Sequence, residues 1–173
     1  MQILVADDDI DAAELYRAAL EDRGHVVTVS LDGQECINFY ANAIERLRLA
    51  GKTPSNKEPF DAVILDYKMP KIDGLEAAKE ILRINASQRI IFASAFVKET
   101  LMDSVKELNQ VMELIQKPFE PDVLVDLVEN VQSAGLMRNL RTLASEIGGD
   151  NTKPSEDQVQ TLLEALQKIQ KAK

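Results

Sequence analysis

Apolar and polar positions follow one another along the chain in blocks that predict alternating strands and helices. Short apolar, β-branched runs are typical of buried strands, and helical spacing of apolar residues follows each run. The strands are expected at residues 3–6, 25–30, 60–65, 89–94 and 111–115. The helices are expected at about 10–23, 33–50, 75–84, 98–109 and 120–131. This alternation predicts a doubly wound α/β fold with a five-stranded parallel sheet, because right-handed crossovers place helices on both faces.

Charged and hydroxyl residues stand where four of these strands end. They are Asp7, Asp8 and Asp9 after the first strand, Asp66 after the third, Ser94 after the fourth and Lys117 after the fifth. The carboxyl ends of parallel strands share one edge of a sheet, and ligands of such sheets bind beyond that edge. These side chains are therefore expected to converge.

Their combined chemistry suits a cation and a phosphoryl group. Crowded carboxylates repel one another unless a cation lies among them, and Mg²⁺ takes one or two carboxylates while keeping places for waters and a phosphate. An ammonium at Lys117 suits a phosphoryl oxygen, and Ser94 supplies a hydrogen-bond donor. Asp66 is then a plausible nucleophile toward phosphorus.

Four sequence segments carry a family resemblance at these same strand ends. They are ILVADDD, VILDYKMPKIDG, FASA and QKPF, in that order. Together they resemble the signature segments of receiver domains of two-component response regulators, over about residues 1–133, and archaeal stand-alone receivers in particular. The resemblance implies a flavodoxin-like sheet in the order 2-1-3-4-5. It also implies a signalling switch that accepts a phosphoryl group from a histidine kinase, with Mg²⁺ as cofactor.

The resemblance assigns a role to each residue of the site. Asp66 is the phosphoacceptor, and Mg²⁺ is held by Asp7, Asp8, Asp66 and the backbone carbonyl of Lys68. Ser94 is the hydroxyl that follows the phosphoryl group, and Lys117 is the ion-pair partner of that group. The bond between Lys117 and Pro118 is expected to be cis, which only a bond to proline adopts at small cost.

Three further positions are expected to tune the switch. Lys68 and Phe96 lie two residues after the phosphoacceptor and the hydroxyl residue, and the resemblance to receivers implies that side chains at these two positions flank the water that hydrolyses an acyl phosphate. Phe96 cannot orient that water, so the phosphoaspartate is expected to be long-lived. Leu114 stands three positions before the lysine, where family members usually carry an aromatic residue, so coupling to the output face is expected to be altered.

The composition of the chain argues against several classes of partner and site. A net charge of −9 and a pI near 4.7 argue against sequence-independent nucleic-acid binding, which needs a basic surface. Cys36 is the only cysteine, so an intramolecular disulfide and a zinc ribbon are excluded, and a core position is expected for it. No apolar run approaches the roughly 18 residues of a membrane helix, and the first residues do not resemble a signal peptide. A cytoplasmic protein without membrane or nucleic-acid partners is expected.

Residues 134–173 lie beyond the resemblance and predict a helical extension of two short helices, with a breaker at about 148–155. Their apolar stripes are Leu136, Leu140, Leu143 and Ile147, then Val159, Leu162, Leu166 and Ile169. Such stripes must pack on the receiver, on each other or on another chain. The interpretation is an extension that docks an unknown downstream protein or forms a homodimer, either through its own helices or through the last receiver helices.

Two other classes of function compete with the signalling switch. The pattern Asp7-x-Asp9 after an apolar strand resembles the first motif of haloacid-dehalogenase-type phosphatases, but Gly149-Asp150 is followed by Pro154 where a second acid is needed. A pseudo-receiver that never phosphorylates is opposed by the presence of all five site residues. The favoured interpretation is a receiver that catalyses only its own phosphorylation and slow dephosphorylation.

Overall fold

The computed structural model describes residues 1–51, 58–108, 112–130 and 164. The chain divides into two units with the boundary between Ala93 and Ser94. The predicted helical extension lies outside the described residues, apart from Glu164, which is helical and exposed. Among the described residues, no helix has the length and apolar character that a membrane span requires.

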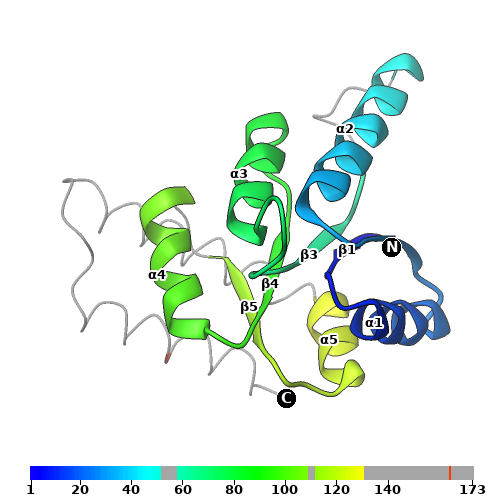
Figure 1. Cartoon of the computed structure of the whole chain (residues 1–173). Coiled ribbons are helices and arrows are strands. Elements are labelled where there is room, and N and C mark those ends of the chain that lie inside the picture. Colours follow the sequence, from blue (N-terminus) through cyan, green and yellow to red (C-terminus); the bar gives the residue numbers. More distant parts are fainter. Residues whose placement is uncertain (52–57, 109–111, 131–163, 165–173) are drawn as a thin grey trace. The chain divides into compact units, whose positions relative to one another are not determined.

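Five strands form one parallel sheet in the order β2-β1-β3-β4-β5, which confirms the predicted fold class (Figure 1). The strands are β1 Gln2–Ala6, β2 Val26–Ser30, β3 Ala62–Asp66, β4 Ile90–Ser94 and β5 Glu113–Gln116. In the register of the sheet, Ala6 at the end of β1 lies opposite Ser30 of β2 and Leu65 of β3. The residues that follow β1 and those at the end of β3 therefore share one edge.

Within residues 1–130, five helices connect or follow the strands in the described part of the chain. They are α1 Ile10–Asp22, α2 Gly33–Leu49, α3 Gly74–Ile84, α4 Val97–Leu108 and α5 Pro121–Glu129. The carboxylates of Asp9, Asp32 and Asp73 accept backbone N–H groups from the first turns of α1, α2 and α3, so each of these residues caps its helix. The third strand was predicted two residues too early, because Phe60 is apolar and buried yet precedes the paired residues.

Helices cover both faces of the sheet in the first unit. Both α1 and α2 pack against β1 and β2, so they occupy opposite faces, and α2 lies beside α3 (Figure 1). The core between these layers is made of fully buried aliphatic residues of β1, β3 and β4. Cys36 on α2 is buried in this core, as predicted, and its burial raises the pKa of the thiol to about 12.

A neutral polar network is buried at the amino ends of β3 and β4. The Tyr40 hydroxyl donates to Oε1 of Gln88 at 2.8 Å. Nε2 of Gln88 donates to the carbonyl oxygens of Phe60 and Arg89 at 3.0 and 3.1 Å. Tyr40 and Gln88 are both fully buried, and burial raises the pKa of Tyr40 to about 12. We call these four residues the Gln88 network.

Candidate functional site

Three carboxylates meet at the carboxyl edge of β1 and β3. Asp7 and Asp8 follow β1 directly, and Asp66 is the last residue of β3. Each offers one oxygen such that all three oxygens lie within 4.8 Å of one another. Asp7 is 2% exposed and Asp66 8% exposed, whereas Asp8 is open to solvent. We call these three residues the acidic cluster.

The acidic cluster has the composition of a site for a hard divalent cation. Negative charges at this separation repel one another, and burial of two of them weakens the screening by water. A divalent cation with oxygen ligands removes that repulsion, and Mg²⁺ retains places for waters and a phosphoryl oxygen. Asp8 is exposed, so the cluster is accessible from solvent.

The loop after Asp66 folds back closely on the strand end. A Cβ atom at Gly74 would lie 2.2 Å from the carbonyl oxygen of Asp66, so only glycine fits there. The Gly74 N–H donates to the carbonyl of Tyr67 at 3.2 Å. The ammonium of Lys68 lies 4.9 Å from the centre of the Tyr67 ring, and the side chain is exposed. This packing fixes the path of the backbone that carries the Lys68 carbonyl.

A second contact holds the same loop from the side of α2. A Cβ at Gly33 would lie 2.2 Å from the carbonyl oxygen of Ile72, so the two backbones touch. The Lys71 ammonium forms an ion pair with the carboxylate of Asp32, which lowers the pKa of Asp32 and raises that of Lys71. Lys71 has a positive φ of 65°, a conformation that a non-glycine residue adopts rarely. The start of α2 therefore braces the loop that begins at Asp66.

The other two predicted site residues belong to the second unit and lie at neighbouring strand ends. The backbone N–H of Lys117 donates to the carbonyl oxygen of Ser94 at 2.9 Å. Ser94 is 1% exposed and Lys117 is half-buried. The Lys117–Pro118 peptide bond is cis, as the resemblance implied. The structure thus brings the predicted residues together as two sets, the acidic cluster in one unit and Ser94 with Lys117 in the other.

Sequence reasoning missed the surroundings of Ser94. Its Oγ lies 2.8 Å from Oγ1 of Thr100 on α4 and accepts the N–H of Phe96 at 2.9 Å. Thr100 is fully buried, and its neighbourhood was not predicted because a single threonine near a helix start is an ordinary feature of sequences. Leu114, the predicted switch position, is buried in β5 with 3% of its surface exposed.

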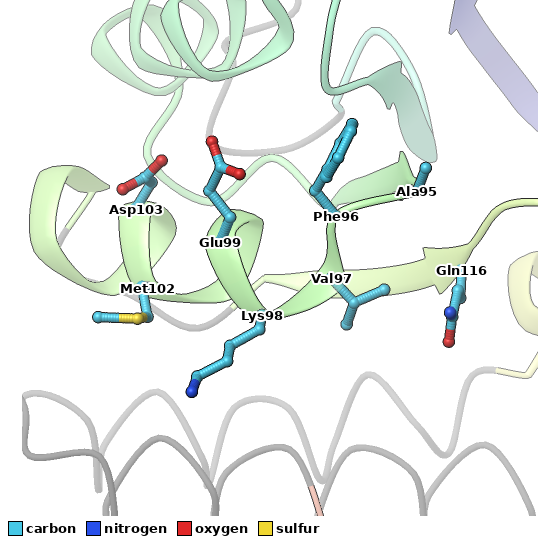
Figure 2. A pocket seen from close by; sticks show the side chains of 8 residues that line it. All are labelled: Ala95, Phe96, Val97, Lys98, Glu99, Met102, Asp103 and Gln116. Carbon is cyan, nitrogen blue, oxygen red and sulfur yellow. The ribbon is translucent and has the colours of Figure 1, made fainter.

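Phe96 and the start of α4 line an open hollow of about 580 Å³ (Figure 2). Its lining consists of Ala95, Phe96, Val97, Lys98, Glu99, Met102, Asp103 and Gln116. Figure 2 shows Phe96, Glu99 and Asp103 on one side of the helix and Lys98 with Met102 on the other. The Phe96 side chain is 53% exposed, so its ring is available to flank an approaching molecule.

The fold and the acidic cluster define a doubly wound α/β protein with a candidate cation site at its strand ends. A sequence model of the response regulator receiver domain matches residues 3–129, and the chain therefore belongs to the receiver family of two-component signalling. Phosphorylation of an aspartate and binding of Mg²⁺ are general to this family, as is pairing with histidine kinases and downstream effectors.

Individual relatives agree with this assignment. The receiver protein CpdR of Brucella abortus is 30% identical over 130 residues, covering 75% of this chain and 95% of CpdR. The transcriptional regulatory protein DltR of Streptococcus agalactiae is 29% identical over 126 residues. The match covers 72% of this chain and 49% of DltR, so this chain spans about half the length of that relative. The solved receiver domain of the Francisella response regulator 1452 has a TM-score of 0.58 at 25% identity, covering 78% of this chain and 98% of that domain.

Proposed function

We propose that this chain is a phosphorylation switch whose phosphoacceptor is Asp66 and whose phosphodonor is a histidine kinase. The observation that carries the proposal is the acidic cluster, in which Asp66 shares one edge with Asp7 and Asp8. Asp66 is buried and ends β3, where it is paired with Ala93 of β4. Asp7 and Asp8 are then left to bind the cation.

The proposed transfer uses Asp66 as a nucleophile. A carboxylate oxygen of Asp66 attacks the phosphorus of a phosphohistidine, the N–P bond breaks, and the imidazole nitrogen takes up a proton. Mg²⁺ held by Asp7, Asp8, Asp66 and the Lys68 carbonyl would neutralise charge on the phosphoryl oxygens. We assign to Lys117 a further positive charge for the phosphoryl group and to Ser94 a hydrogen bond to it.

The output is proposed to be a contact with another protein. Receivers of this family act on effectors. The periodic apolar positions in the sequence of residues 136–169 support a role of this segment in binding such an effector or a second copy of this chain. The net charge of −9 supports a protein partner rather than nucleic acid for this chain by itself.

The direct test is incubation with acetyl phosphate, with Mg²⁺ or with a chelator, followed by intact mass measurement and mapping of the modified residue. The expected result is a single phosphoryl group on Asp66 that requires Mg²⁺. Asp66→Asn should abolish labelling, whereas Asp61→Asn, at an exposed residue that precedes β3, should leave it unchanged. Undiminished labelling of Asp66→Asn would overturn the site assignment.

A further inference from the structure

The hydroxyl of Ser94 is held inside the second unit by the first turn of α4. Its Oγ accepts the backbone N–H of Phe96 at 2.9 Å and lies 2.8 Å from Oγ1 of Thr100. Oγ1 of Thr100 also lies 2.8 Å from the carbonyl oxygen of Phe96. Ser94 is 1% exposed and Thr100 is fully buried, so no solvent replaces these bonds.

Each hydroxyl has a single proton, and this determines which of Thr100 and Ser94 donates in each hydrogen bond. The carbonyl oxygen of Phe96 can only accept, so the proton of Thr100 must point to it, since two oxygens at 2.8 Å without a proton between them repel. The contact between Thr100 and Ser94 then needs the proton of Ser94. Ser94 has one proton, and it is committed to Thr100 in this state.

A phosphoryl oxygen at Asp66 would need that same proton. We propose that Thr100 is a positioning residue that holds the Ser94 hydroxyl in the unphosphorylated chain, so that Thr100 and the phosphoryl group compete for Ser94. This inference rests on the proposed function and deepens it by naming the regulation of that site. When Ser94 turns to the phosphoryl group, Phe96 N–H and Thr100 both lose a partner, and the first turn of α4 must rearrange.

Because Thr100 lies on α4, its competition with the phosphoryl group for Ser94 would couple α4 directly to the phosphorylation of Asp66. Leu114 is an aliphatic residue buried in β5, and it has no polar side-chain atom with which to register the state of Ser94. Thr100 has one, lies on the helix itself and contacts Ser94 directly. The coupling that an aromatic residue would supply at position 114 is assigned here to a hydroxyl on α4.

The test measures the affinity of the chain for beryllofluoride, a phosphoryl mimic, in the presence of Mg²⁺ by calorimetry. Thr100→Val keeps the shape but removes the hydroxyl, so Ser94 is released and beryllofluoride should bind about fivefold tighter, the equivalent of one neutral hydrogen bond. Thr100→Ser should restore the wild-type affinity. Ser104→Ala is the matched control, because Ser104 is a buried hydroxyl of α4 that donates to the Leu101 carbonyl.

A measurement on the unmodified chain guards against a variant that fails to fold. The Phe96 amide should lose protection from hydrogen exchange when beryllofluoride binds, because its acceptor Ser94 moves away. Unchanged affinity in Thr100→Val, or unchanged protection of the Phe96 amide in the wild type, would overturn the role of Thr100 alone. If the wild type neither binds beryllofluoride nor takes phosphate from acetyl phosphate, the proposed function fails and the role of Thr100 falls with it.

Discussion

At the carboxyl edge of the first unit, three carboxylates have oxygens within 4.8 Å of one another, and at its amino edge the Gln88 network buries a neutral set of polar groups. In the network each donor meets an acceptor, and each carbonyl that Gln88 contacts receives an N–H. The acidic cluster instead gathers charges of one sign. The two edges belong to the same sheet and are separated by the length of β3.

This contrast indicates that the amino edge contributes to stability and the carboxyl edge to function. A satisfied buried network specifies the packing of its neighbours, and breaking it leaves polar atoms without partners. Crowded carboxylates oppose folding through their mutual repulsion, and a bound cation relieves that repulsion. The comparison therefore predicts opposite responses to substitution at the two edges.

The largest effect is expected from breaking the Gln88 network. Gln88→Leu keeps the volume but removes the acceptor that the Tyr40 hydroxyl uses and the N–H groups donated to the Phe60 and Arg89 carbonyl oxygens, of which the Arg89 oxygen also accepts the N–H of Val63. The free energy of unfolding, measured in urea, should fall by about 3 kcal/mol. Gln34→Leu on the exposed face of α2 is the matched control and should change stability by less than about 0.5 kcal/mol. Equal effects of the two substitutions would refute the stabilising role of the network.

Alkaline pH should lower the free energy of unfolding through Tyr40 of the Gln88 network. Burial raises the pKa of Tyr40 from 10.0 to about 12, so between these values the unfolded chain has lost a proton that the folded chain keeps. The stabilisation is complete below pH 10.0 and is lost as the pH rises toward 12. The expected loss is about 2 kcal/mol by urea unfolding. Cys36, raised from 9.0 to about 12, adds to this loss, so the comparison is best made in a Cys36→Ala background.

Tyr40→Phe in that background provides the control for alkaline unfolding. It removes the titrating group and should flatten the fall in stability over the same pH range, although its stability at neutral pH is lower by the lost hydrogen bond. If the Cys36→Ala protein and the double variant decline equally with pH, another group is responsible.

The sequence predicted the acidic cluster and not the Gln88 network, for a physical reason. Asp7, Asp8 and Asp66 stand at the ends of apolar runs, and the geometry of parallel sheets alone brings strand ends together. Tyr40 and Gln88 are 48 positions apart and end no run. Their pairing depends on how α2 packs over the sheet, which no local pattern encodes.

The loop after Asp66 also contains features that could not be predicted from the sequence. A helix was predicted to begin at about residue 33, but the contact between Gly33 and the Ile72 backbone is a tertiary feature that the sequence pattern does not show. The positive φ of Lys71 was also not predicted, because glycine or asparagine is the usual signal of that conformation. Thr100 was missed in the same way, since its importance comes only from its distance to Ser94.

A smaller effect is expected on the lifetime of the phosphorylated state. Phe96 is half exposed, and an aromatic ring cannot orient the water that attacks phosphorus. Phe96→Glu and Phe96→Ala should speed the loss of phosphate from Asp66, by roughly tenfold or about 1.4 kcal/mol of barrier. The decay of the phosphorylated mass after removal of the phosphodonor measures this rate. Identical decay in wild type and both variants would show that Phe96 does not control access of water.

The most direct test of the account is the effect of Mg²⁺ on stability in the wild type and in Asp8→Asn, with Asp11→Asn as a control outside the acidic cluster. Without Mg²⁺, Asp8→Asn should be more stable than the wild type, because one of three crowded charges is removed. At a Mg²⁺ concentration about five times Kd, the wild type and Asp11→Asn should gain about 1 kcal/mol of unfolding free energy, and Asp8→Asn much less. A wild type that does not respond to Mg²⁺, or an Asp8→Asn variant that gains as much as the wild type, would contradict the claim that the acidic cluster is a cation site.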